Sequence, residues 1–307
     1  MSPLRKAQWQ IHFCVLLWGF TAILGKLITL SALVLVCWRM ALVTVALLLV
    51  PRVWRGLRAL PVRLLGAYAG VGVLVALHWL TFYGAIKLAN ASVAVSCIAL
   101  APVFLAVLEP WVSGRRFDPR ELLLGALVIP GVVLVVGGVP TSMHAGIAVG
   151  VLSAALVAAF GAFNKRLVEH ADPLTVTCVE LGVGGVFLGL VAVPALLLSQ
   201  RAGAPLLLWP GARDAGLLLL LALACTLLPF VLSLIALRQL SAFQAQLAVN
   251  LEPVYAIVLA SALLHEQREL GSSFYLGVAI ILLAVFAHPL LISRSTPGSR
   301  DRTTRSS

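Results

Sequence analysis

Long apolar runs recur along the whole chain, separated by short stretches that carry Pro, Gly and charged residues. A helix rises about 1.5 Å per residue, so about 20 apolar residues cross the ~30 Å hydrocarbon core of a bilayer. Lipid excludes open sheet edges and irregular backbone, because their peptide groups would lack hydrogen-bond partners. The sequence therefore predicts an all-α integral membrane protein with ten transmembrane helices, at residues 9–29, 31–50, 64–86, 91–112, 121–139, 145–164, 173–198, 215–237, 242–264 and 270–292.

The composition excludes a soluble fold. Hydrophobic residues make up 61% of the 307-residue chain and charged residues 11%, against roughly 45–50% and 25% in soluble domains. A mean hydropathy of +1.07 over the full length places apolar side chains on the surface as well as in the core. The five cysteines lie in apolar runs without CxxC spacing, which favours free buried thiols over disulfides or metal ligands. We expect no metal and no cofactor.

The distribution of basic residues sets the expected orientation. The chain has 22 Lys and Arg residues and a net charge of +11. With the N-terminus in the cytoplasm, sixteen of the 22 fall in cytoplasmic segments, four in external segments and two within spans. Cytoplasmic loops accumulate Lys and Arg, so both termini are predicted to be cytoplasmic, and the charge requires no nucleic-acid partner. Residues 293–307 are expected to form a basic cytoplasmic tail near anionic lipid.

The sequence repeats itself with an offset of 151 residues. Residues 85–91 (AIKLANA) align with 236–242 (ALRQLSA), and Pro102–Val103 aligns with Pro253–Val254 without a gap. Five expected spans thus precede five similar ones, in halves at 1–140 and 141–292. Because five is odd, the second half enters the membrane from the opposite side. This predicts two inverted five-helix repeats, an arrangement that transporters use for alternating access.

Motifs in both halves resemble those of the EamA-type transporters of the drug/metabolite transporter superfamily, across nearly the whole chain. The matching residues are Trp18–Gly19, Lys26, Arg39, Ala101–Pro102–Val103, Leu251–Glu252–Pro253–Val254 and His265–Glu266. The chain departs from the family pattern where Gly114–Arg115 replaces the usual Gly-Glu after the fourth span, so no role is assigned to a glutamate in that loop. The resemblance implies a bacterial inner-membrane carrier, usually an exporter of amino acids or related small metabolites, with a cavity lined by helices one to four and six to nine.

Charged residues inside the expected spans differ in depth. Lys26 and Glu109 lie about three residues from the ends of their spans, which favours side chains that reach the interface. Arg39 lies about 12 Å from one end of its span and Glu180 about 10 Å from the opposite end of its own, leaving an axial gap of about 8 Å in a ~30 Å core. Their spans, the second and the seventh, are equivalent in the repeat. Two interpretations stay open, an Arg39–Glu180 ion pair and contact of both residues with a substrate.

Glu252 is expected near the midplane of the membrane, about 15 Å into the ninth span. The adjoining Pro253 lacks an N–H group and frees a carbonyl one turn earlier, which opens the helix where a ligand can bind. Gln246 and Asn250 share one helical face with Pro253. Because low-dielectric surroundings favour a neutral carboxyl group, Glu252 is a candidate for proton exchange; the alternative is a structural glutamate that braces the Pro break.

An aromatic stripe runs along the third span. His78, Trp79, Phe82 and Tyr83 are spaced by one, three and four residues, so they share one helix face. Core packing or an interfacial belt is the ordinary explanation, but His78 and Trp79 lie seven to eight residues from the span end, too deep for headgroups. The alternative is the wall of a cavity that suits an amphipathic metabolite.

Three glycine pairs have the GxxxG spacing that brings helices close together. They are Gly66/Gly70, Gly146/Gly150 and Gly185/Gly189. Close helix packing is the expected role of all three pairs, in preference to ligand contact.

The function that fits these features best is a carrier that exports small metabolites, expected to be amino acids or related amphipathic compounds, by alternating access. Protons are a candidate coupling ion, and the unit is expected to be a monomer or homodimer. A membrane-embedded enzyme acting on a lipid-linked substrate is the alternative, but the chain has no DxxD, HExxH or GxSxG motif and its acidic residues are scattered. The candidate substrate-binding residues are Trp18, Arg39, His78, Trp79, Phe82, Glu180, Gln246, Asn250 and Glu252.

The split of basic residues makes a direct topological prediction. A cysteine introduced at Arg58 should be protected from an impermeant thiol reagent in intact cells and should react after the membrane is opened, because the 52–63 segment is expected to face the cytoplasm. Ready labelling of intact cells would show that the orientation is reversed.

Overall fold

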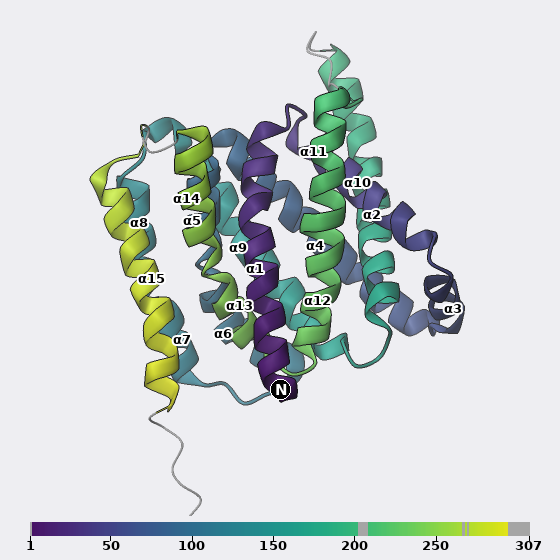
Figure 1. Ribbon diagram of the computed structural model, residues 1–307, viewed down its shortest axis with the longest axis horizontal. Coiled ribbons are helices and arrows are strands. Elements are labelled where there is room, and N and C mark those ends of the chain that lie inside the picture. The colour runs from purple at the N-terminus through teal and green to yellow at the C-terminus, as the bar shows by residue number, and fades with distance from the viewer. Residues whose placement is uncertain (1, 202–207, 266–267, 269, 294–307) are drawn as a thin grey trace, which may run out of the picture.

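The protein is helical throughout the part that the computed structural model describes, which is residues 2–201, 208–265, 268 and 270–293. Figure 1 shows the helices packed side by side, with α1 in the middle of the view and α3 and α15 toward opposite edges. The elements are α1 (Pro3–Leu27), α2 (Ala32–Leu48), α3 (Pro51–Ala59), α4 (Val62–Leu88), α5 (Ala91–Ile98), α6 (Ala101–Ser113), α7 (Pro119–Ala126), α8 (Ile129–Gly137), α9 (His144–Leu167), α10 (Pro173–Arg201), α11 (Ala212–Ala222), α12 (Leu228–Leu237), α13 (Ala242–Val249), α14 (Glu252–Leu264) and α15 (Ser272–Ser293), with a 3-10 turn η1 at Thr141–Met143 and a π-helical turn η2 at Leu223–Leu227.

The all-α prediction is confirmed, and the chain is a multi-pass membrane protein. Among the described residues, seven helical stretches are long and apolar enough to cross a membrane, or eight if α2 and α3, which meet at 93°, form one span. The expected fifth span is divided between α7 and α8. The number ten therefore stays a prediction. The segment expected to be a simple break at residues 51–61 forms α3 instead, and the basic tail beyond residue 293 lies outside the described residues.

The fourth and ninth spans are broken helices that match each other residue by residue. The bounds of α5 and α6 become the bounds of α13 and α14 when 151 is added to each residue number. Asn90 and Ser241, also 151 apart, each accept a backbone N–H at the start of α5 and α13. Gly114 and His265 end α6 and α14 with positive φ angles of 68° and 57°. The two-repeat architecture is thus visible down to the caps of single helices.

These two broken helices pack against each other in antiparallel fashion. The first piece of one contacts the second piece of the other, because α5 packs on α14 and α6 packs on α13. At the crossing, the side-chain amide of Asn250 donates a hydrogen bond of 3.3 Å to the carbonyl of Ala99. Asn250 and Ala99 are themselves 151 residues apart, and equivalent residues touch only near the axis that relates two repeats. The crossing therefore marks that axis.

Two basic residues at equivalent positions hold the loops between spans. Lys87, at the end of α4, donates a hydrogen bond to the carbonyl of Ile28, which follows α1. Arg238, which follows α12, donates one of 2.9 Å to the carbonyl of Ala171, which lies between α9 and α10. In each half, the end of the third span is thereby fastened to the connection between the first and the second.

Glycine allows close packing at only some of the expected positions. A Cβ atom added to Gly146 would lie 2.7 Å from the Cβ of Ala89, and one added to Gly150 would lie 2.9 Å from the Cβ of Cys97, so this pair packs as expected. Gly185 would meet Met40 at 3.3 Å, whereas Gly189 would meet nothing within 4 Å. Gly66 and Gly70 also face open space. The prediction of close helix packing is wrong for that last pair.

Candidate functional site

A cavity of about 120 Å³ lies at the centre of the bundle. This volume is several times what one water molecule needs, so the cavity can admit a small molecule. Its wall is built from α1, α2, α4, α5, α6, α9, α12, α13 and α14. The resemblance implied lining by the seventh span as well, but α10 contributes no lining residue. Seven candidate residues line the cavity, namely Trp18, Arg39, His78, Trp79, Phe82, Gln246 and Glu252.

Arg39 is the cation of the cavity, and its orientation is fixed by three neighbours. Its Nε donates to the hydroxyl of Thr226 at 2.6 Å and its Nη1 donates to the hydroxyl of Tyr83 at 2.8 Å. Its guanidinium carbon lies 3.8 Å from the centre of the Trp79 ring, a cation–π geometry that is strongest away from water. Thr226 belongs to the π-helical turn η2 and itself donates to the carbonyl of Leu221 at 2.6 Å. Such turns widen a helix locally and are common at functional sites.

The structure contradicts the expected pairing of Arg39 with Glu180. Glu180 is fully buried, accepts a hydrogen bond of 3.3 Å from the amide of Asn164, and has one carboxyl oxygen with no partner among the described residues. The ion pairs in the described part of the chain do not include Arg39. Glu180 also does not line the cavity, although its partner Asn164 does. Its backbone packs closely on α4, since its carbonyl oxygen would lie 2.3 Å from a Cβ added to Gly72.

Glu252 supplies the carboxyl group opposite Arg39 in the cavity. It is the first residue of α14, where the partial positive charge of the helix N-terminus favours a carboxylate. It is 7% exposed, it lines the cavity, and Arg39 interacts with it electrostatically. The side-chain nitrogen of Gln246, on α13 and six residues earlier in the chain, is buried without a hydrogen-bond partner in the described structure. A carboxyl group and an amide donor thus remain available to a ligand.

Asn250 does not take the role expected from its helical face. It is 1% exposed and donates to Ala99 at the crossing of the two broken helices, outside the cavity lining. Gln246 and Asn250 do not present one common face to the cavity, because the helix is broken between α13 and α14. Only Gln246 lines the cavity. The expectation for Asn250 is corrected from ligand contact to a structural contact between the repeats.

The aromatic stripe of α4 forms one wall of the cavity. His78, Trp79 and Phe82 are buried and line it. The Nδ1 atom of His78 lies 3.0 Å from the carbonyl oxygen and 2.9 Å from the hydroxyl oxygen of Ser153 on α9, which fixes the ring. The interfacial belt is therefore the wrong explanation for these side chains. Tyr83, the fourth member, instead orients Arg39.

Other lining residues were missed by the sequence analysis. They are polar or aromatic side chains on α1, α9 and α12, namely Thr21, Asn164, Phe160, Phe230 and Ser233. Nothing in the sequence separated them from ordinary packing residues.

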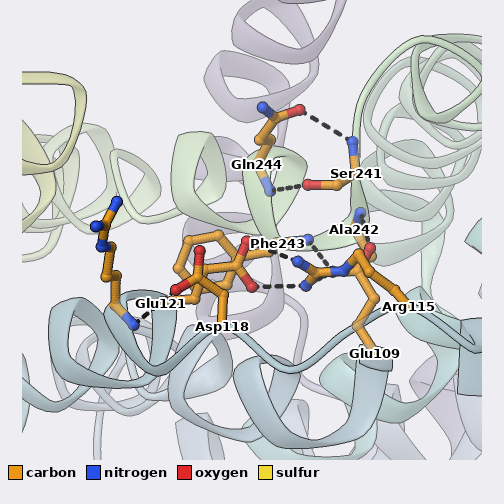
Figure 2. Close-up of polar contacts among 9 residues, drawn as sticks. Glu109, Arg115, Asp118, Glu121, Ser241, Ala242, Phe243 and Gln244 are labelled. Atoms are coloured by element: carbon orange, nitrogen blue, oxygen red, sulfur yellow. Dashed lines mark hydrogen bonds and ion pairs between the residues drawn. The ribbon is translucent and has the colours of Figure 1, made fainter. Parts of the chain in front are cut away.

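A polar cluster joins the two halves next to Ala242, a residue that lines the cavity (Figure 2). Glu109 of α6 accepts hydrogen bonds from the first two backbone N–H groups of α13, at Ala242 (3.0 Å) and Phe243 (2.8 Å). Arg115 bridges Glu109 at 3.5 Å and Glu121 at 2.6 Å. The hydrogen bonds from Arg115 to Glu121 raise the pKa of that guanidinium.

This geometry corrects the expectation for Glu109. The residue was expected to reach the interface, yet it is 1% exposed. The N-terminus of a helix carries unpaired N–H groups and partial positive charge, so a carboxylate there is stabilised without reaching water. Leu105, Leu237 and Ala242, which line the cavity, lie on the elements around this cap. The arginine that replaced the family's usual glutamate, Arg115, completes the cluster.

Comparison with known proteins agrees with the fold and the motifs. The model of the EamA-like transporter family matches the chain twice, over residues 7–137 and 144–288. One solved crystal structure of a protein aligns with a TM-score of 0.69 at 15% identity, covering 95% of this chain and 99% of that one. At this identity the likeness concerns the fold alone. No curated protein matches the chain.

The Glu109 cap gives a prediction about stability. Glu109→Ala should lower the free energy of unfolding by roughly 1–3 kcal/mol, because two buried N–H groups lose their acceptor. Glu109→Gln keeps one acceptor oxygen and should lose less. Thermal unfolding in detergent, followed by tryptophan fluorescence, measures the difference. Glu169→Ala, an exposed acidic residue after α9, is the control; equal stability of the two alanine variants would contradict the capping role.

Proposed function

Since the chain belongs to the EamA-like transporter family, we propose that it is a bacterial inner-membrane carrier that exports an amino acid or a related amphipathic metabolite by alternating access. The observation that carries the proposal is the presence of a guanidinium and a carboxyl group on one buried cavity, Arg39 on one wall and Glu252 on another. A zwitterion has a carboxylate and an ammonium group that complement this pair. The aromatic wall of α4 suits an apolar side chain.

Alternating access is supported by the relation between the repeats. The broken helices cross in antiparallel fashion at equivalent residues, Ala99 and Asn250, as expected for halves 1–140 and 141–292 of inverted topology. Lys87 and Arg238 fasten equivalent loops in the two halves, which lie at opposite faces if the topology is inverted. If the halves exchange conformations, these contacts loosen in turn and open the cavity to one face and then to the other.

Glu252 is the proposed site of proton coupling. It faces the cavity and shares its surroundings with a fixed cation. A proton that binds Glu252 removes the charge opposite Arg39 and so changes what the cavity holds. The unit is proposed to be a monomer or homodimer with both termini in the cytoplasm. The match to a transporter family over residues 7–137 and 144–288 gives the enzyme alternative no support.

Transport of a panel of amino acids and related metabolites into proteoliposomes tests the carrier function. We expect counterflow of at least one zwitterionic compound, reduced at least tenfold by Arg39→Gln, because that variant keeps polar atoms but removes the charge. Arg55→Gln, an exposed residue of α3, should transport normally. If no zwitterion exchanges, or if Arg39→Gln exchanges it as well as wild type does, the proposed substrate class is wrong.

The coupling role of Glu252 is tested in the same vesicles. Glu252→Gln resembles the protonated carboxyl group in shape and hydrogen bonding, so it should retain counterflow and lose accumulation driven by a pH gradient. Glu252→Asp, which can still bind a proton, should retain part of both. Wild-type pH-driven accumulation by the Gln variant would leave Glu252 as a structural brace of the Pro253 break.

A further inference from the structure

A second hollow lies away from the central cavity, on the outside of the bundle between α4 and α9. It is a groove of about 860 Å³ that begins at the N-terminal end of α4 and the C-terminal end of α9. Its walls are formed by Pro61, Arg63, Leu64, Gly66, Ala67, Gly70, Val71 and Leu74 from the α4 side and by Phe163, Arg166, Leu167 and His170 from the α9 side. None of the residues that line the central cavity takes part.

The floor of the groove is open because two glycines face it. A Cβ atom added to Gly66 or Gly70 would meet nothing within 4 Å, so these glycines do not serve helix contact. They lie about one helical turn apart. Because neither residue has a side chain, the groove continues along α4 past both positions. Leu64, Leu74 and Phe163 make the walls apolar. From residue 63 to residue 74 the groove extends about 16 Å, close to half of a ~30 Å hydrocarbon core.

The entrance of the groove carries positive charge. Arg63 and Arg166 both line it and both are exposed. Arg166 is held in place by donating a hydrogen bond of 3.0 Å to the carbonyl of Val112, and Nδ1 of His170 lies 3.2 Å from the carbonyl of Leu167. Aspartate and glutamate are missing from the lining residues. The groove therefore has two guanidinium groups at one end. The apolar part of the groove behind them is about as long as one leaflet of the bilayer is thick.

We infer that this groove binds one anionic phospholipid, with its phosphate at Arg63 and Arg166 and an acyl chain over Gly66 and Gly70. Basic pockets between membrane helices recognise lipid headgroups in this way, and the guanidinium fork matches phosphate oxygens. A second copy of the chain fits poorly, because a two-fold contact through this face would bring the same arginines together. The site is independent of the transported substrate.

Native mass spectrometry of the full-length protein in detergent tests the inference. With phosphatidylglycerol as the probe, we expect one lipid to remain bound under conditions that strip phosphatidylcholine. Arg63→Ala with Arg166→Ala should weaken phosphatidylglycerol binding roughly 30-fold. Arg55→Ala with Arg58→Ala removes two basic residues of α3 that do not line the groove and should leave binding unchanged.

The apolar part of the site is tested separately by filling it. Gly66→Leu with Gly70→Leu should abolish retention of the lipid, and it should not impair folding, because the new side chains enter open space. Gly189→Leu, another glycine that faces open space, is the matched control. Equal retention of the two lipids by wild type, wild-type binding by the filled variant, or displacement of the lipid by millimolar inorganic phosphate would each overturn the inference.

Discussion

The contact between Asn250 and Ala99 is the constraint around which the bundle is organised. Ala99 and Asn250 are the C-caps of α5 and α13, where the last helical carbonyls have no partner within the helix. In lipid such carbonyls are costly unless another group pairs with them, and the amide of Asn250 pairs with the carbonyl of Ala99. This hydrogen bond joins the two breaks beside the cavity that α5, α6, α13 and α14 help to line.

The polar side chains gather in the cavity because the helix surfaces around it are covered by apolar side chains. Arg39 is supported by Thr226, Tyr83 and the ring of Trp79, so its charge is oriented before any ligand arrives. The side-chain nitrogen of Gln246 has no hydrogen-bond partner among the described residues, and Glu252 lines the same cavity. A preorganised cation beside unpaired polar groups favours a ligand that brings its own charges. The cap at Glu109 ties the same broken helices together at one end.

Sequence periodicity predicted the helices, the repeat and seven of the lining residues, because hydropathy and spacing report position along a helix axis. Periodicity did not predict which way a side chain points around the helix axis. Arg39 and Glu180 have compatible depths, but Arg39 points to η2 and Glu180 lies against α4. Gly66 and Gly70 have the spacing of a packing motif, yet no helix covers them. A π-helical turn, which positions Thr226, leaves no periodic signal in an apolar run.

In the proposed transport mechanism, the two halves move in opposite senses about the crossing of the broken helices. Double electron–electron resonance between spin labels tests it most directly, with one label pair at Arg116 and Gln239 near the α6 end and another at Leu88 and Leu263 near the α14 end, after the native cysteines are replaced. The account predicts that substrate or a pH change lengthens one distance while it shortens the other. Distances that stay constant, or that change in the same direction, in protein that transports would contradict it.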